Sequence, residues 1–180
     1  MERDRRVAGI VGFFILLAYI VLAYMFTDSK VIVVSAEIVA GIAVIGIAVF
    51  MFPLLRKYGK GLANFYLSSK FVEGALMVVA GIFFLFSGSW LFEMRDPIYV
   101  VHAFIFIFSA AAFYVLLYRS KIIPRWISVW GVVACVSLLI GNALEIFYTY
   151  DLLKLFYLLI ILNEFFLAGW LIFRGFDKRV

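Results

Sequence analysis

Six ionisable side chains of this chain lie inside long apolar stretches, where charge is costly. A charged group at the centre of a membrane-crossing helix costs about 2.5–3.5 kcal/mol on insertion scales. Six such groups in 180 residues therefore indicate side chains that are paired or functional. The ionisable residues are Glu37, Lys70, Glu73, His102, Glu145 and Glu164, and amides accompany them at Asn64, Asn142 and Asn163.

These residue types fit three kinds of chemistry. Carboxyl and imidazole groups can bind or relay protons, and a protonated carboxyl can act as a general acid. Carboxylates together with one imidazole can also hold a divalent ion, but the spacing here does not predict a metal site. The sequence contains no H-E-x-x-H, C-x-x-C, phosphate-loop or nucleophile motif. We therefore expect no metal and no cofactor, and the sequence identifies no catalytic residue.

The spacing of two pairs predicts which side chains share a helical face. Lys70 and Glu73 are three residues apart, which favours an internal ion pair on one face of a helix. Asn142 and Glu145 have the same spacing, and Glu145 lies shallow enough to reach interfacial water. Glu73, Asn142 and Glu145 are candidate binding residues, and the favoured role of Lys70 is a structural one as the ion-pair partner of Glu73.

The remaining candidates have no charged neighbour in the sequence. Asn163 and Glu164 sit in mid-span between Leu, Ile and Phe residues, so Glu164 either has a partner on another helix or is protonated. His102 could exchange protons near neutral pH, or only hydrogen-bond to a neighbouring helix. Glu37 is isolated among small and apolar residues, so we expect it to face another helix.

Six apolar runs must position these groups. Apolar residues make up 67% of the chain and charged residues 15%, against about 45–50% and about 25% in soluble domains, which excludes an ordinary soluble fold. Each run has enough residues to cross about 30 Å of hydrocarbon. Short links between the runs predict an all-α, up-and-down bundle of six transmembrane helices that forms one domain over residues 1–180. The predicted spans are 7–26, 31–55, 62–87, 97–118, 126–147 and 152–173.

Basic residues divide unequally between the two sides of this bundle. Twelve of the 16 Lys and Arg residues lie on the side of the termini and the even-numbered links, whereas Lys30, Arg95 and Lys154 lie on the other. By the positive-inside rule, both termini are cytoplasmic in a multi-pass protein of a prokaryotic plasma membrane. The net charge of +5 thus comes from basic links that orient the protein in the membrane. We expect the lipid bilayer as its partner, and no nucleic acid.

The rise of a helix places the polar groups at different depths. At about 1.5 Å per residue, Glu37, His102 and Glu145 lie near the outer boundary, and Glu73 and Glu164 near the midplane. If they converge, they line a cavity open to the outside. The alternative is that each group only links two helices. Because span 62–87 is polar on two faces, we expect it at the centre of the bundle.

A short pattern recurs in the third and sixth spans. Phe-Tyr-Leu is followed by a glutamate in both, from Phe65 to Glu73 and from Phe156 to Glu164. A duplication of three spans would give an inverted repeat, as in many transporters, with the two glutamates equivalent. Chance in an aromatic-rich chain is the alternative.

With the spans placed, the chain resembles the uncharacterised membrane family known as domain of unknown function 4386. The resemblance rests on Arg6 to Gly9, Val72 to Gly74, Tyr118 to Arg125 and Glu164 to Gly175. It implies no known activity. It does imply that Glu73, Glu164 and the basic loop from Arg119 to Arg125 belong to a shared pattern.

Three functions remain open on the sequence. The first is a small transporter or binder of a small hydrophobic or ionic ligand or a proton, with Glu73 and Glu164 as deep groups and His102 as a relay. The second is an intramembrane enzyme acting on a lipid or isoprenoid, with a buried glutamate as general acid. The third is a structural or assembly protein whose polar groups are paired internally. The oligomeric state is not predicted.

Overall fold

The computed structural model describes residues 2–27, 29–86, 88–145 and 154–177. It contains six helices long and apolar enough to cross a membrane, which confirms the prediction of an all-helical protein with six helices of that length. Residue 87 and the span ends at 146–147 and 152–153 lie outside the described residues. The long helices are α1 (Glu2–Ala18), α2 (Lys30–Leu55), α3 (Lys60–Phe84), α5 (Arg95–Ser120), α6 (Arg125–Glu145) and α7 (Lys154–Phe173).

Three short elements depart from the predicted spans. The run 7–26 is not one regular helix, because α1 ends at Ala18 and the 3₁₀ helix η1 (Tyr19–Met25) follows. Such runs rarely exceed three or four residues, and this one contains neither Gly nor Pro. A second 3₁₀ turn, η2 (Arg56–Tyr58), follows α2, and α4 (Trp90–Glu93) precedes α5.

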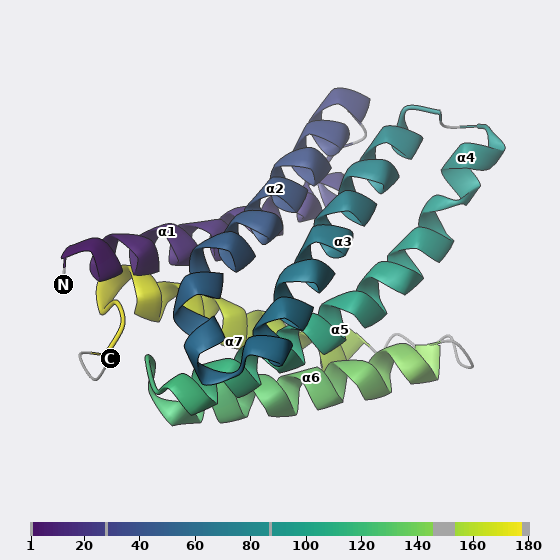
Figure 1. The fold of residues 1–180 in the computed structure, drawn as a ribbon. Coiled ribbons are helices and arrows are strands. Elements are labelled where there is room, and N and C mark those ends of the chain that lie inside the picture. Colours follow the sequence, from purple (N-terminus) through teal and green to yellow (C-terminus); the bar gives the residue numbers. More distant parts are fainter. Residues whose placement is uncertain (1, 28, 87, 146–153, 178–180) are drawn as a thin grey trace.

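The long helices form a closed ring in two layers. Each packs against the next one along the chain, and α1 packs against α7 to close the ring. In Figure 1, α2, α3 and α5 run side by side, and α1, α7 and α6 form the layer against them. The middle helix of one layer is therefore α3, and the middle helix of the other is α7.

Small residues allow the closest helix contacts in this ring. A Cβ atom added at Gly41 would lie 2.7 Å from the carbonyl oxygen of Gly74, and one at Gly74 would lie 2.7 Å from that of Gly41. At the seam between α1 and α7, a Cβ atom at Gly12 would lie 2.7 Å from the carbonyl oxygen of Ala168. Backbones that approach this closely are typical of helix pairs in membranes.

Helix α3 is not at the centre of the bundle. It packs against α2 and α5 among the long helices, and its outer face is exposed at Phe65, Phe71 and Val72. The expectation failed because the second polar face is not buried: Asn64 is exposed near the start of the helix, and the Ser68 hydroxyl donates to the Phe65 carbonyl of its own helix.

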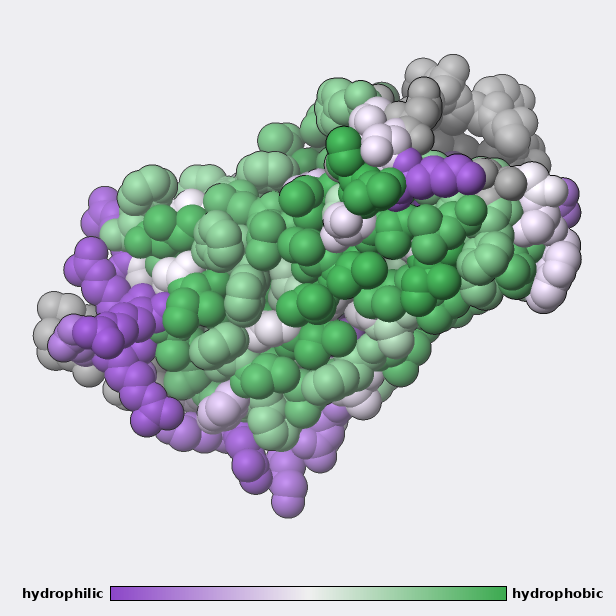
Figure 2. Space-filling model, turned by 90° about the horizontal axis from the view of Figure 1, so that it is seen from above, coloured by the Kyte–Doolittle hydropathy of each residue, from purple (hydrophilic) through white to green (hydrophobic). Residues whose placement is uncertain are grey.

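The surface divides into an apolar belt and a hydrophilic end. Figure 2 shows hydrophobic side chains over most of the visible face and hydrophilic ones gathered at the end where both termini lie in Figure 1. The links between α2 and α3 and between α5 and α6 also reach this end (Figure 1). Lys178 and Arg179 lie outside the described residues.

Candidate functional site

The interior of the ring contains a buried ion pair on α3. The Lys70 ammonium lies 2.9 Å from the Glu73 carboxylate, and both side chains are buried. The Ser109 hydroxyl of α5 donates to Glu73 Oε2 over 3.0 Å. The Lys70 nitrogen also lies 4.9 Å from the centre of the Phe106 ring. Pairing within one helix lowers the cost of placing these charges in the apolar interior.

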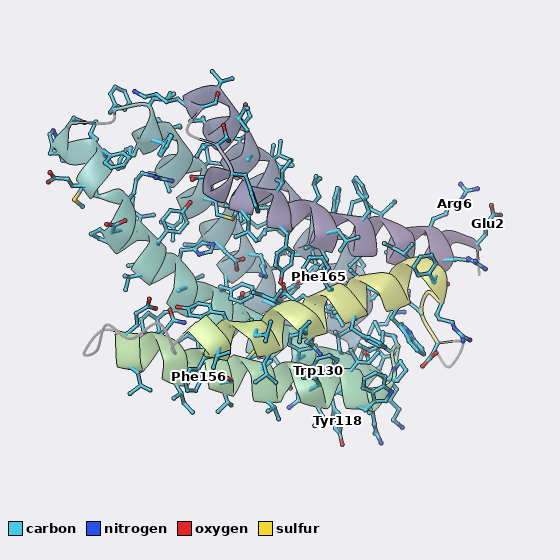
Figure 3. All side chains as sticks on the ribbon, turned by 180° about the vertical axis from the view of Figure 1, so that it is seen from behind. Glu2, Arg6, Tyr118, Trp130, Phe156 and Phe165 are labelled. Atoms are coloured by element: carbon cyan, nitrogen blue, oxygen red, sulfur yellow. The ribbon has the colours of Figure 1, made fainter. Side chains whose placement is uncertain are left out.

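A second carboxyl group faces the interior from α7. The Tyr19 hydroxyl donates to Glu164 Oε2 over 2.8 Å, and the Tyr19 ring packs against Phe165 with centroids 4.7 Å apart. Figure 3 shows Phe165 where α1 crosses α7. Tyr19 is the first residue of η1, so the helix changes its winding at the residue that contacts Glu164. Among the described residues, Glu164 has no Lys, Arg or His nitrogen within 4.0 Å.

A cavity of about 30 Å³ lies between the two layers, with Lys70 and Glu164 in its lining. Tyr66 of α3 and Tyr114 of α5 also line it. Both tyrosines are fully buried, and their hydroxyls have no hydrogen-bond partner within the described part of the chain. A space of this size accommodates about one or two water molecules.

Electrostatic interactions connect the two halves of this central site. The charges of Lys70 and Glu73 act on Glu164 across the cavity, and they also act on His102. In an interior of low dielectric constant, such interactions are stronger than in water. A change of protonation at Glu164 therefore alters the energy of the ion pair on α3.

A separate cluster, the Arg95 cluster, lies at the start of α5, at the end of the bundle away from the termini (Figure 1). Arg95, at the start of α5, donates to Glu37 Oε1 over 2.5 Å and to the Ala80 carbonyl over 3.0 Å. Its guanidinium lies over the rings of Phe84, Phe92 and Tyr99, at 4.5–5.8 Å from their centres. Glu37 is 0% exposed. The cluster neutralises this carboxylate and joins α2, α3 and α5.

His102 lies on α5 between Arg95 and Ser109, and so between the Arg95 cluster and the central site. Its ring meets Tyr99 edge to face, with centroids 5.9 Å apart. The imidazole has no fixed hydrogen-bond partner at Nε2 within the described part of the chain.

The remaining candidates link α6 to α7. The Tyr157 hydroxyl donates to Glu145 Oε2 over 2.7 Å and lies 3.3 Å from Asn142 Oδ1. Glu145 is exposed. Asn163 is fully buried and donates to the Ile127 carbonyl over 3.1 Å. These contacts hold two helices together, as intramembrane polar groups commonly do for about 0.6 kcal/mol each.

The structure thus divides the candidate residues into groups rather than bringing them into one cavity. Lys70, Glu73 and Glu164 meet in the centre, and His102 lies close enough to interact with their charges. Glu37 belongs to the Arg95 cluster. Asn142, Glu145 and Asn163 form the contacts between α6 and α7. Glu164 is the one predicted carboxylate in the lining of the cavity.

Comparison with known protein families agrees with this architecture. A family model with the description "Domain of unknown function (DUF4386)" matches residues 7–175. The chain belongs to this family. The match includes every long helix apart from the first residues of α1, and so includes all the candidate residues of this DUF4386 protein. No curated protein and no solved structure matches the chain.

The central carboxylates lie apart from the larger hollow of the structure. In the described ranges, no group of three or more His, Cys, Asp or Glu residues is placed to hold a metal ion. A larger hollow of about 270 Å³ lies between α5 and α6, and its lining includes neither Glu73 nor Glu164. Of the two deep carboxylates, Glu164 lines the small cavity, and Glu73 is bound by Lys70 and Ser109.

Sequence reasoning missed several residues of these clusters. Tyr19, Tyr66 and Tyr114 counted as apolar members of their spans, and Arg95 counted as part of a link. One signal was available: a tyrosine hydroxyl inside a span is a polar group, so Tyr19, Tyr66 and Tyr114 belonged with the polar candidates. The two Phe-Tyr-Leu motifs also differ in surroundings, since Tyr66 lines the cavity and Tyr157 binds Glu145.

Proposed function

We propose that this DUF4386 protein is a small transporter of the prokaryotic plasma membrane whose central site binds a proton at Glu164. In this proposal the six helices form one domain, and both termini face the cytoplasm. The observation that supports it is the water-sized cavity where Glu164 and Lys70 meet two buried tyrosine hydroxyls without partners among the described residues.

The chemistry of Glu164 favours a proton as the bound species. An isolated carboxylate in a medium of low dielectric constant is unfavourable, and taking up a proton removes that charge. Glu73 is different, because Lys70 and Ser109 already bind it. The cavity is too small for a lipid, whereas a water molecule there could bridge Glu164 to Tyr66 and Tyr114. Such hydrogen bonds would stabilise both the protonated and the charged form of the carboxyl.

Proton movement by purified protein in liposomes tests this proposal. Liposomes containing pyranine and a potassium gradient acidify inside when valinomycin sets a potential and a proton pathway exists. We expect faster acidification with the wild type than in liposomes without protein. Glu164→Gln should abolish the difference, because the amide cannot take up a proton, and Tyr66→Phe should reduce it.

Glu145→Gln is the matched control, since Glu145 is an exposed carboxylate in a span, and it should keep the wild-type rate. Thermal unfolding of each variant checks that it is folded. A wild-type rate equal to that of empty liposomes, or an unchanged rate in folded Glu164→Gln, would contradict the proposal.

The second candidate function is a structural one, in which the buried polar groups only hold the helices together. Glu37 and Glu73 each have a cationic partner within 2.9 Å, so the charge of both carboxylates is balanced within the protein. If Glu164→Gln lowers thermal stability and the wild type moves no protons, the polar groups act in assembly alone.

A further inference from the structure

An open groove lies between α5 and α6 at the end where the basic links gather. Its volume is about 270 Å³, and four of its seven lining residues are valines, including the exposed Val129 and Val133. Tyr118, Arg119 and Ser128 complete the lining. A groove of this composition offers apolar walls along its length and a cation at one end, which matches the division of a phospholipid into chain and headgroup.

Two arginines place positive charge at the mouth of this groove. Arg119 is exposed in the last turn of α5, and a Cβ atom built on Gly59 would lie 3.4 Å from its Nη1. Its guanidinium therefore lies beside the link between α2 and α3. Arg125 begins α6, and its guanidinium lies 4.9 Å from the centre of the Tyr118 ring. Basic pockets between helices on this side of a membrane suit anionic headgroups.

Ser128 provides an independent sign of a polar occupant. Its side chain is 0% exposed, and its hydroxyl has no hydrogen-bond partner among the described residues. A buried hydroxyl without a partner costs about 1–3 kcal/mol. It lines the groove between the valines, where the glycerol or ester oxygens of a lipid could accept its hydrogen.

The backbone beside the groove is also unusual. Lys121 ends α5 in the left-handed conformation, with φ of 55°, and is the one non-glycine residue with positive φ in the part of the chain described. Glycine adopts this conformation without strain. A lysine there keeps a third positive charge in the link at a cost of about 1–2 kcal/mol. In this conformation the Lys121 amide donates to the Leu117 carbonyl and ends the helix.

We propose that the groove between α5 and α6 binds one anionic phospholipid, with an acyl chain along the valines and the phosphate at Arg119 and Arg125. The proposal shares with the proposed function only the placement of the chain in a membrane. It does not depend on the proton site, because Glu164 and Glu73 do not line the groove.

Thermal unfolding of the purified protein in detergent, with added phosphatidylglycerol or phosphatidylcholine, tests this site. We expect phosphatidylglycerol to raise the unfolding temperature more than phosphatidylcholine, and native mass spectrometry to detect one retained phosphatidylglycerol. Arg119→Gln should weaken the apparent affinity about fivefold, since one basic residue near an anionic membrane surface contributes about 1 kcal/mol.

Two further variants separate a groove from diffuse attraction. Val129→Trp fills the groove from an exposed position and keeps every charge, so it should abolish the preference for phosphatidylglycerol without lowering the unfolding temperature in detergent alone. Arg56→Gln removes an exposed charge at the same end, where Arg56 lies over Phe52, and should keep the wild-type affinity. If Arg56→Gln weakens binding as much as Arg119→Gln, if Val129→Trp leaves the preference intact, or if the two lipids stabilise equally, the proposal is overturned.

Discussion

The buried ion pair between Glu37 and Arg95 allows a prediction in which the two partners have unequal effects. Arg95→Met removes the cation and leaves a carboxylate that is 0% exposed. Breaking a buried pair in this way costs about 3–5 kcal/mol of unfolding free energy. Glu37→Gln instead leaves a guanidinium that still donates to the Ala80 carbonyl and lies over three aromatic rings. Its cost should be about 1.5–3 kcal/mol, the value of a hydrogen bond to a charged group.

The double variant measures the interaction itself. Once Arg95 is replaced, Glu37→Gln removes an unpaired charge rather than a bond, so the double variant should be less destabilised than the sum of the single variants by about 0.5–3 kcal/mol. Unfolding by sodium dodecyl sulfate in mixed micelles, followed by circular dichroism, gives the four free energies. Glu93→Gln, an exposed carboxylate in α4, is the control and should change stability by less than about 0.5 kcal/mol.

Two results would refute this reasoning. If the single effects add without a coupling term, the two side chains do not form an energetically significant pair. If Glu37→Gln costs more than Arg95→Met, the aromatic rings and the Ala80 carbonyl do not hold the guanidinium as the geometry indicates.

Two further predictions concern single contacts and use the same unfolding measurement. Gly41→Ala should lower the free energy of unfolding by about 1–3 kcal/mol through overpacking, because its Cβ atom would lie 2.7 Å from the Gly74 carbonyl oxygen. The control Gly61→Ala, with nothing within 4 Å of its Cβ atom, should have little effect. Equal effects would show that the α2–α3 contact is looser than described. Tyr19→Phe should cost about 1.5–3 kcal/mol through loss of the hydrogen bond to Glu164, and a cost no greater than that of Tyr58→Phe would contradict that bond.

The spans were predictable because the bilayer thickness sets their length. The predicted run 62–87 and the observed α3 (Lys60–Phe84) agree within a few residues. The break at Tyr19 was not predictable, since no Gly or Pro marks it. Its position coincides with a contact to α7, which is far away in the sequence.

The partners of the buried charges were predictable only within a helix. The spacing of Lys70 and Glu73 fixed their relation before any fold was known, and the ion pair is present. The pairing of Glu37 with Arg95 depends on where α5 begins and on which helices are neighbours in the ring. The periodicity of residues along one helix predicts neither the start of α5 nor the order of the helices in the ring. The same holds for Tyr19 and Glu164, which meet only because the ring is closed.

The seam between α1 and α7 has a consequence for biogenesis. It joins Gly12 of α1 to Ala168 of α7, two helices that are synthesised at different times. Until α7 has been inserted, α1 has a neighbour on one side only, and Tyr19 has no Glu164 to bind. The earlier helices can associate as they emerge, but assembly of the central site must be post-translational or nearly so. A chain that lacks α7 therefore has no Glu164 for Tyr19 to bind, and its central site stays incomplete.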